Sequence, residues 1–78
     1  MIVLSQDEKH MVNMNLVEFV TVFENVINFK HYAIQVSTSD NYQTIGTYTE
    51  EERAKQVFHE LMRIWSGGGA SLYKMPKG

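Results

Sequence analysis

The sequence predicts an α+β fold: a mostly antiparallel β-meander sheet of five or six strands, one amphipathic helix packed on one face of that sheet, and a short C-terminal strand. Segments rich in β-branched and aromatic residues, separated by polar turn clusters, run from Ile2 to Tyr48 and are typical of strands. From about residue 50 to 66 the apolar spacing changes to a helical period. With 78 residues, the chain is expected to form a single α+β domain, 1–78.

The N-terminal segments predict three strands. Ile2–Leu4 is the first, followed by the polar turn "SQDEK", and "MVNMN" at 11–15 is a short second strand. Leu16–Phe23, "LVEFVTVF", has the residue types that fit a pleated, half-buried surface. Phe19 and Phe23 share one face of this third strand, and we expect that face to lie in the core.

The following segments predict a hairpin. We interpret Glu24 and Asn25 as a two-residue turn, from which 26–29 returns as the second strand of the hairpin. Periodicity leaves open an alternative in which 26–38 forms one long bent strand. The stretch "YAIQVST" at 32–38 alternates cleanly between apolar and polar residues, so it is expected to be a strand with one buried face.

Two further strands flank the helix. "YQTIGTY" at 42–48 is the strand before it, and "SLYKM" at 71–75 is a short strand after it that Pro76 ends. Gly46 lies inside the first of these strands. A glycine there predicts a β-bulge, or a place where another backbone or the helix passes close.

The helix has a recognisable beginning. Thr49 is predicted to be the N-cap, with Glu52 three residues later completing a capping box, in which each side chain accepts a hydrogen bond from an otherwise unpaired backbone N–H. Glu50 and Glu51 lie where the helix dipole favours negative charge. The acidic triplet therefore has a structural explanation and does not by itself predict a cation site.

The helix also has an apolar stripe and a clear end. The run from Gly67 to Gly69 is expected to stop the helix with a residue in the left-handed conformation. Trp65 is expected to pack against the sheet, near the strand that holds Phe19 and Phe23; in the alternative, it lies at the rim and anchors a partner chain. The spacing i, i+3, i+4, i+7, i+8, i+11 places on one face Ala54, Val57, Phe58, Leu61, Met62 and Trp65.

The segment closest to a catalytic motif is "HELMR" at 59–63. A zinc metalloprotease needs His-Glu-x-x-His, so that two imidazoles on one helix face bind one metal. Here the fifth position is Arg63, which cannot ligate zinc, and the histidine falls on the polar side of the helix. We therefore predict no enzyme activity and no catalytic, cofactor-binding or metal-binding residues. The alternative left open by the sequence is a shared metal site formed by His10, His31, His59 and Asp7.

Composition limits the function classes. The chain has no cysteine, which excludes disulfides and thiolate metal sites. Its net charge of −2 argues against nucleic acid, because domains that bind it usually carry a basic face. The first residues, "MIVLSQDEKH", do not have the pattern of a signal peptide, and no apolar run reaches the roughly 20 residues that cross a bilayer. We expect a cytoplasmic protein without a membrane partner.

Three tyrosines are the candidate interaction surface: Tyr42, Tyr48 and Tyr73. Exposed tyrosines with few basic neighbours are more typical of a protein interface than of a nucleic-acid site. A protein partner or self-association, such as a homodimer, is therefore expected, and the sequence indicates nothing about small molecules. The alternative is a nucleic-acid-binding accessory protein, which would be favoured if one sheet face gathered Lys9, Lys30, Lys74 and Lys77.

Several short segments together resemble a family. They are "LSQD" at 4–7, "IGTYTEEERA" at 45–54 with the helix after it, and "YKMP" at 73–76. The chain is similar to small uncharacterised proteins of Gram-positive bacteria and their phages, which begin with Ile-Ser-Gln-Asp, enter one helix through Ile-Gly-Thr-Tyr-Ser/Thr-x-Glu-Glu, and end near Tyr-x-Met-Pro. Leu4 and Glu8 depart from that pattern. The resemblance covers about half of the chain and implies an origin in such bacteria or their phages, without implying an activity or any site residues.

Overall fold

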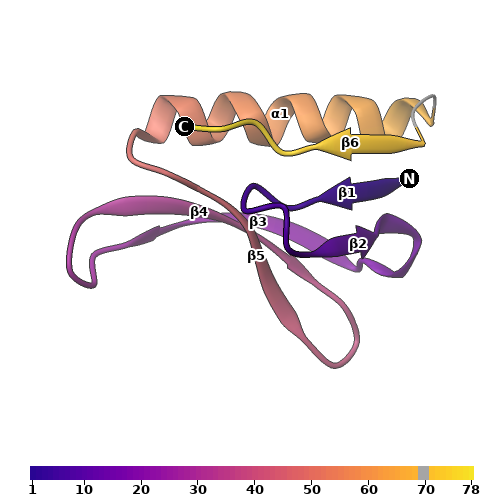
Figure 1. Cartoon of the computed structure of the whole chain (residues 1–78), viewed down its shortest axis with the longest axis horizontal. Coiled ribbons are helices and arrows are strands. Elements are labelled where there is room, and N and C mark those ends of the chain that lie inside the picture. Colours follow the sequence, from indigo (N-terminus) through magenta and orange to yellow (C-terminus); the bar gives the residue numbers. More distant parts are fainter. Residues whose placement is uncertain (69–70) are drawn as a thin grey trace.

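The computed structural model describes residues 1–68 and 71–78. These residues form six strands, a single-turn 3-10 helix and one α-helix (Figure 1). In chain order the elements are β1 (Ile2–Leu4), β2 (Met11–Asn13), η1 (Met14–Leu16), β3 (Phe19–Asn25), β4 (His31–Ser37), β5 (Tyr42–Tyr48), α1 (Glu51–Gly67) and β6 (Leu72–Lys74).

The strands divide into two sheets of three. The terminal sheet has the order β2-β1-β6, and the meander sheet has the order β3-β4-β5. All pairs are antiparallel except β1 with β6. In Figure 1, β6, β1 and β2 lie side by side beneath α1, and the meander sheet lies beyond them. The predicted α+β class with mostly antiparallel strands and one helix is confirmed; the division into two sheets is an addition that the sequence did not indicate.

The β3–β4 hairpin corrects two sequence-based expectations. β3 continues through Glu24 and Asn25, and residues 26–30 form the turn, so neither the two-residue turn nor one bent strand over 26–38 is right. Two asparagines account for the longer turn. The Asn25 Oδ1 atom accepts a hydrogen bond from the Ile27 N–H at 2.9 Å, and Asn28 takes the left-handed conformation at φ 68°, which asparagine tolerates better than most residues.

The beginning of β3 also differs from the prediction. The structure has a 3-10 turn over Met14–Leu16, where a strand from Leu16 was expected. The Asn13 side chain closes this turn by accepting from the Asn15 N–H at 3.0 Å. Met14 is thereby placed in the core, whereas Leu16 is left exposed.

The faces of β3 are the reverse of the expectation. Val20 and Val22 pack against the core, so Phe19 and Phe23, one residue out of phase, lie on the other face. Phe19 is 50% exposed. Because side chains alternate along a strand, the pair of valines and the pair of phenylalanines cannot both face inward. The larger apolar side chains, those of the two phenylalanines, therefore lie on the face away from the core.

β4 and β5 follow the sequence closely. β5 has the predicted bounds, and β4 begins and ends one residue before its predicted bounds. Ile34 pairs with Gly46, but the next residue, Gln35, pairs with Thr44. Ile45 is therefore the extra residue of a β-bulge, as Gly46 predicted.

α1 starts later than its predicted cap. The N-cap is Glu50, with φ −115° and ψ 134°, and no side-chain hydrogen bond caps it. The expected Thr49 cap and its capping box with Glu52 are therefore absent from the part of the chain described. At the other end Gly68 has φ 66°, the left-handed residue that was predicted; Gly69 lies outside the described residues.

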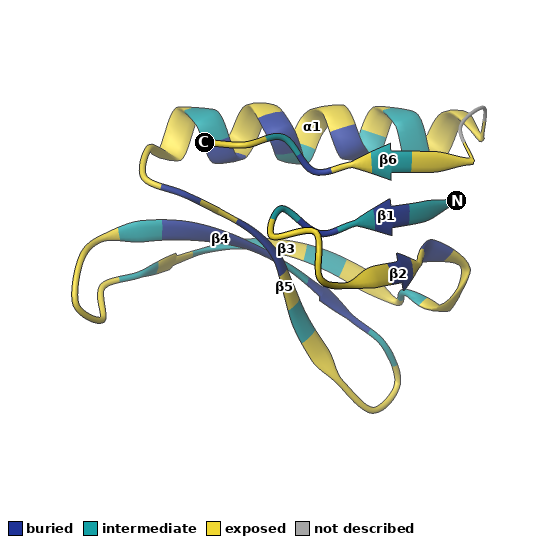
Figure 2. Ribbon diagram, in the orientation of Figure 1, coloured by how far each residue is buried: buried dark blue, intermediate teal, exposed yellow. Residues whose placement is uncertain are grey.

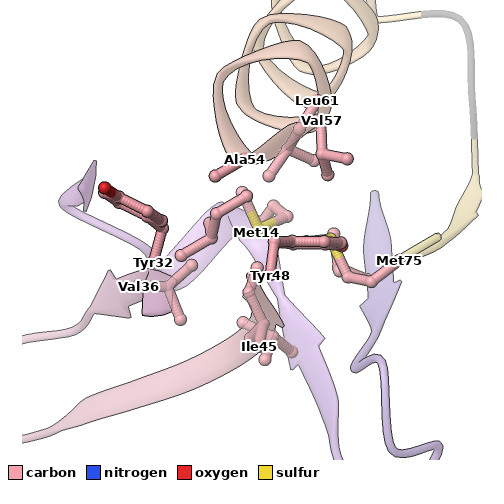
Figure 3. Close-up of a cluster of buried hydrophobic side chains, with 12 residues drawn as sticks. Met14, Tyr32, Val36, Ile45, Tyr48, Ala54, Val57, Leu61 and Met75 are labelled. Carbon is pink, nitrogen blue, oxygen red and sulfur yellow. The ribbon is translucent and has the colours of Figure 1, made fainter. Parts of the chain in front are cut away.

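The core lies between α1 and the two sheets. From the helix, Ala54, Val57 and Leu61 are buried, and Figure 3 shows them above Tyr48. In Figure 2 the outer side of α1 and the turns of the meander are among the exposed parts. Trp65 packs against this cluster but is only partly buried. It lies at the margin of the core and not at its centre.

The helix start generates the first prediction. Because Thr49 does not cap α1, Thr49→Ala should change the free energy of unfolding by less than about 0.5 kcal/mol. Glu50→Asp, which offers a shorter side chain at an N-cap position with suitable backbone angles, should stabilise the protein by about 0.5–1 kcal/mol. Urea denaturation of both variants is the measurement. A loss near 1 kcal/mol for Thr49→Ala would contradict this assignment and support the capping box.

Candidate functional site

Gln6 joins the two sheets to the C-terminal segment. Its backbone N–H donates to the Ile45 carbonyl at 2.7 Å, and its Oε1 atom accepts from the Thr47 N–H at 2.8 Å. Its Nε2 atom donates to the Pro76 carbonyl at 3.2 Å. One side chain thus covers part of the outer edge of β5 and also binds the chain beyond β6. We call this arrangement the Gln6 junction.

Tyr48 completes the Gln6 junction from inside. Its hydroxyl donates to the Pro76 carbonyl at 2.8 Å, and the residue is 1% exposed. Tyr48 is therefore not a surface residue, which corrects the sequence-based expectation. Burial raises the pKa of Tyr48 from its ordinary value of 10.0 to about 12, because the phenolate would lose its hydration there.

The bulge explains why Tyr48 was misplaced. Simple alternation puts Tyr42 and Tyr48 on the same face of β5, but the extra residue at Ile45 reverses the phase between them. Gly46 also makes room for the ring. A Cβ atom on Gly46 would lie 3.0 Å from the Tyr48 ring and hydroxyl and 3.1 Å from Met75 Cε. The close approach predicted at Gly46 is therefore made by the side chains of Tyr48 and Met75, and not by another backbone or by the helix.

The segments that carry the sequence resemblance lie together at this junction. "LSQD" contributes Gln6, "IGTY" contributes residues 45–48, and "YKMP" contributes Met75 and Pro76. Each of these residues has a partner that holds the fold together. The pattern can therefore be explained by packing, without a catalytic role for its members.

A serine, a histidine and an aspartate lie close together in the loop after β1. The Ser5 hydroxyl donates directly to Asp7 Oδ1 at 2.5 Å, and the backbone N–H of His10 donates to the Ser5 oxygen at 3.1 Å. In a catalytic triad the imidazole stands between the hydroxyl and the carboxylate. Here His10 Nδ1 is 3.8 Å from Asp7 Oδ1, on the far side. The three residues close the loop.

The hydrogen bonds that close this loop also lower the pKa of Asp7. The Ser5 hydroxyl is the main cause, and the Lys9 backbone N–H, 3.0 Å from Asp7 Oδ1, adds to it. Both hydrogen bonds favour the ionised carboxylate. Glu8, which lies between Asp7 and Lys9, takes the left-handed conformation at φ 61°. Most residues avoid this backbone geometry, and the side-chain hydrogen bonds of the loop compensate for it.

The histidines are not brought together. His31 Nδ1 lies 3.0 Å from the Phe29 carbonyl, and the ring is 4.8 Å from the Phe29 ring. His59 is exposed on α1, as predicted, with its ring edge toward Phe58. Within residues 1–68 and 71–78, no three side chains of the metal-ligating types are grouped so as to hold an ion.

A half-open hollow of roughly 200 Å³ lies beside the Gln6 junction. It runs along the outer edge of β5 and is lined by Gln6, Asp7, Thr44, Ile45, Gly46 and Thr47. Asp7 is the ionisable side chain in this lining, and its Oδ1 atom accepts from the Ser5 hydroxyl and from the Lys9 N–H within its own loop.

Three of the lysines form ion pairs with glutamates. Lys74 Nζ and Lys77 Nζ lie 4.0 and 3.4 Å from the Glu8 carboxylate. Lys30, in the β3–β4 turn, pairs with Glu24 at 3.2 Å, which is the main reason why its pKa is raised. Of the lysines named for the nucleic-acid alternative, Lys74 and Lys77 therefore share one carboxylate, and Lys30 pairs with a different one.

Tyr42 and Tyr73 have different surroundings. The Tyr73 hydroxyl donates to Glu60 Oε1 at 2.6 Å, which ties β6 to α1; burial and this carboxylate raise its pKa. Tyr42 is 69% exposed, and its ring meets Phe19 edge-on at 6.3 Å. Of the three predicted surface tyrosines, Tyr42 is the exposed one. Phe19 is its partner, and sequence reasoning missed it by placing it in the core.

Tyr42 and Phe19 belong to a larger surface, which we call the outer face. The strand register aligns three rows of residues across β3, β4 and β5 on the side away from Ile34 and Val36. The rows contain no charged side chain. They are Phe19–Ser37–Tyr42, Thr21–Gln35–Thr44 and Phe23–Ala33–Thr47.

Comparisons of the chain with family models, with curated proteins and with solved structures found no match. Among the described residues, no helix has the length and apolar character that crossing a membrane requires.

Tyr48 generates a pH prediction. The pKa of Tyr48 is higher in the folded than in the unfolded state, so its contribution to stability is present below pH 10 and lost as the pH rises toward 12. The free energy of unfolding should fall over that interval. Tyr48→Phe should weaken the fall, leaving the part due to Tyr73. Urea titrations at closely spaced pH values measure this, with Tyr42→Phe as the control; an unchanged slope in Tyr48→Phe would contradict it.

The Gln6 junction generates a stability prediction. Gln6→Ala removes two side-chain hydrogen bonds and should lower the free energy of unfolding by about 1–3 kcal/mol. The matched control is Gln56→Ala on the exposed side of α1, which should stay within about 0.5 kcal/mol of wild type. Equal values for the two variants would mean that the junction contributes nothing measurable.

Proposed function

We propose that this chain is a small non-enzymatic protein-interaction module, working in the cytoplasm as an accessory protein of phage or mobile-element origin. The observation that carries the proposal is the exposed aromatic pair of Phe19 and Tyr42 on the outer face. Phe19 is 50% and Tyr42 69% exposed, although both are large and apolar enough to be core residues. Exposed aromatic groups of this kind are enriched at the centres of protein interfaces.

Both members of the pair stand on paired strands. Phe19 and Tyr42 flank Ser37 of the central strand β4, and Ser37 is only 6% exposed beneath them. Both rings project from hydrogen-bonded strands and not from flexible turns. Little conformational entropy is therefore lost when a partner covers them, which favours affinity.

The rest of the outer face fits a protein partner better than nucleic acid. Its three rows contain no lysine or arginine, whereas contacts to phosphates supply most of the affinity for nucleic acid. Interface centres are depleted of charge. An uncharged sheet surface with aromatic and threonine side chains is of that kind.

The test is capture of a partner from the native host by tagged wild-type protein and by the Phe19→Ala, Tyr42→Ala double variant. Loss of two aromatic anchors should weaken binding of the captured partner by at least about tenfold. Leu72→Ala, an exposed apolar change on the terminal sheet, is the control and should retain the partner. The captured protein is then purified, and its affinity for each variant is measured directly.

Equal binding by wild type and the double variant would remove the outer face from consideration. Fluorescence anisotropy with labelled single-stranded and duplex oligonucleotides tests the alternative. Salt-sensitive binding that the double variant retains would favour a nucleic-acid partner and contradict the proposal.

A further inference from the structure

The edges of the two sheets are treated differently. β2 and β6 are strands of three residues, and β6 carries Lys74 and is followed by Pro76. The outer edge of β5 is bulged at Ile45 and partly covered by Gln6. Short strands, lysine, bulges and covering segments are the devices by which proteins prevent their sheet edges from pairing with other strands.

β3 has fewer of these devices, since its one charged residue is Glu24, near its end, which pairs with Lys30. It is seven residues long and pairs with β4 on one side only. Its register with β4 is regular from Phe19 to Asn25, and its sequence "FVTVFEN" contains no lysine or proline. Within the described residues, the backbone of β3 therefore presents an edge that pairs with no other strand, and the groups it presents are complementary to another extended strand.

The side chains of β3 leave apolar surface on both faces of this edge. On the core side Val20 and Val22 are only partly buried, whereas their cross-strand neighbours Val36 and Ile34 are 2% and 0% exposed. On the outer face Phe19 is half exposed. A strand added beyond β3 would cover all three.

We propose that β3 pairs antiparallel with β3 of a second copy of this chain, forming a twofold-symmetric dimer with one continuous sheet of six meander strands. The inference goes beyond the proposed interaction function, because the contact is made by the edge of β3 and not by the aromatic pair of the outer face. The two copies present identical edges, which antiparallel pairing about a twofold axis makes self-complementary. A peptide partner would need side-chain pockets along the edge for specificity, and the hollow beside Gln6 lies at the opposite edge of the sheet.

Strand length and charge together favour one register. Pairing centred on Val22 uses all seven residues of β3 and places Thr21 opposite Phe23 of the partner subunit, a favourable combination of β-branched and aromatic side chains. Pairing centred on Thr21 would place Glu18 opposite Glu24 of the partner subunit, and like charges directly opposite are unfavourable. The dimer axis is therefore expected at Val22.

The test is the oligomeric state of the whole chain, measured by sedimentation over a wide concentration range. Wild type should show a monomer–dimer equilibrium. Thr21→Lys places a charge at the interface twice per dimer and should raise the dimer dissociation constant at least about tenfold. Thr44→Lys is the matched control, because Thr44 lies in the same row of the outer face on the opposite edge strand. It should leave the equilibrium unchanged.

A second measurement does not depend on the folding of the lysine variant. The chain has no cysteine, so Val22→Cys introduces a single thiol that faces its own copy across the axis. Mild oxidation should cross-link Val22→Cys into a dimer and leave Thr44→Cys monomeric. A monomeric wild type, a dimer insensitive to Thr21→Lys, or equal cross-linking of the two cysteine variants would each overturn the proposal.

The two proposals fail separately. A monomeric wild type that still binds a partner through Phe19 and Tyr42 would overturn the dimer and leave the interaction module intact. If Thr21→Lys disrupts a dimer but partner binding does not need the aromatic pair, the dimer stands and the proposed interaction surface is overturned.

Discussion

The carbonyl oxygen of Pro76 is the acceptor on which the arrangement of the two sheets depends. It receives hydrogen bonds from Gln6 Nε2, on the side of the terminal sheet, and from the Tyr48 hydroxyl, at the end of the meander sheet. A carbonyl oxygen has two lone pairs, and both are used here. Because Tyr48 is also at the centre of the core, the Gln6 junction links the polar and apolar interactions that hold α1 and the sheets together.

Local signals in the sequence were sufficient where one element determined the outcome. The strand Tyr42–Tyr48, the left-handed glycine at the end of α1 and the 3.7 Å ion pair of Glu51 with Lys55 all follow from short-range patterns. The β3–β4 turn did not, because its left-handed residue is Asn28 and not the glycine that usually marks such a turn. Thr49 has the side chain of a cap, but the N-cap position falls one residue later, at Glu50, and α1 begins at Glu51.

The candidate site was predictable only in part, because its residues depend on which way a strand faces. Tyr42 was correctly placed on the surface and Tyr48 was not, although the bulge that separates them was predicted from Gly46. The prediction did not take into account that the bulge reverses which face of the strand the residues after it occupy. For Phe19, the choice between two apolar faces of one strand depends on the packing of α1 and β4, which no local pattern contains.

The parallel pairing of β1 with β6 affects the order in which the protein folds. Ile2 pairs with Leu72, and Gln6 binds Pro76, 70 residues further along the chain. The meander sheet pairs only neighbouring segments, so it can form before β1 meets β6, since local contacts form faster than distant ones. In that interval the β3 edge is already formed while the core still lacks the terminal sheet, and transiently exposed surface of this kind is prone to misassociation.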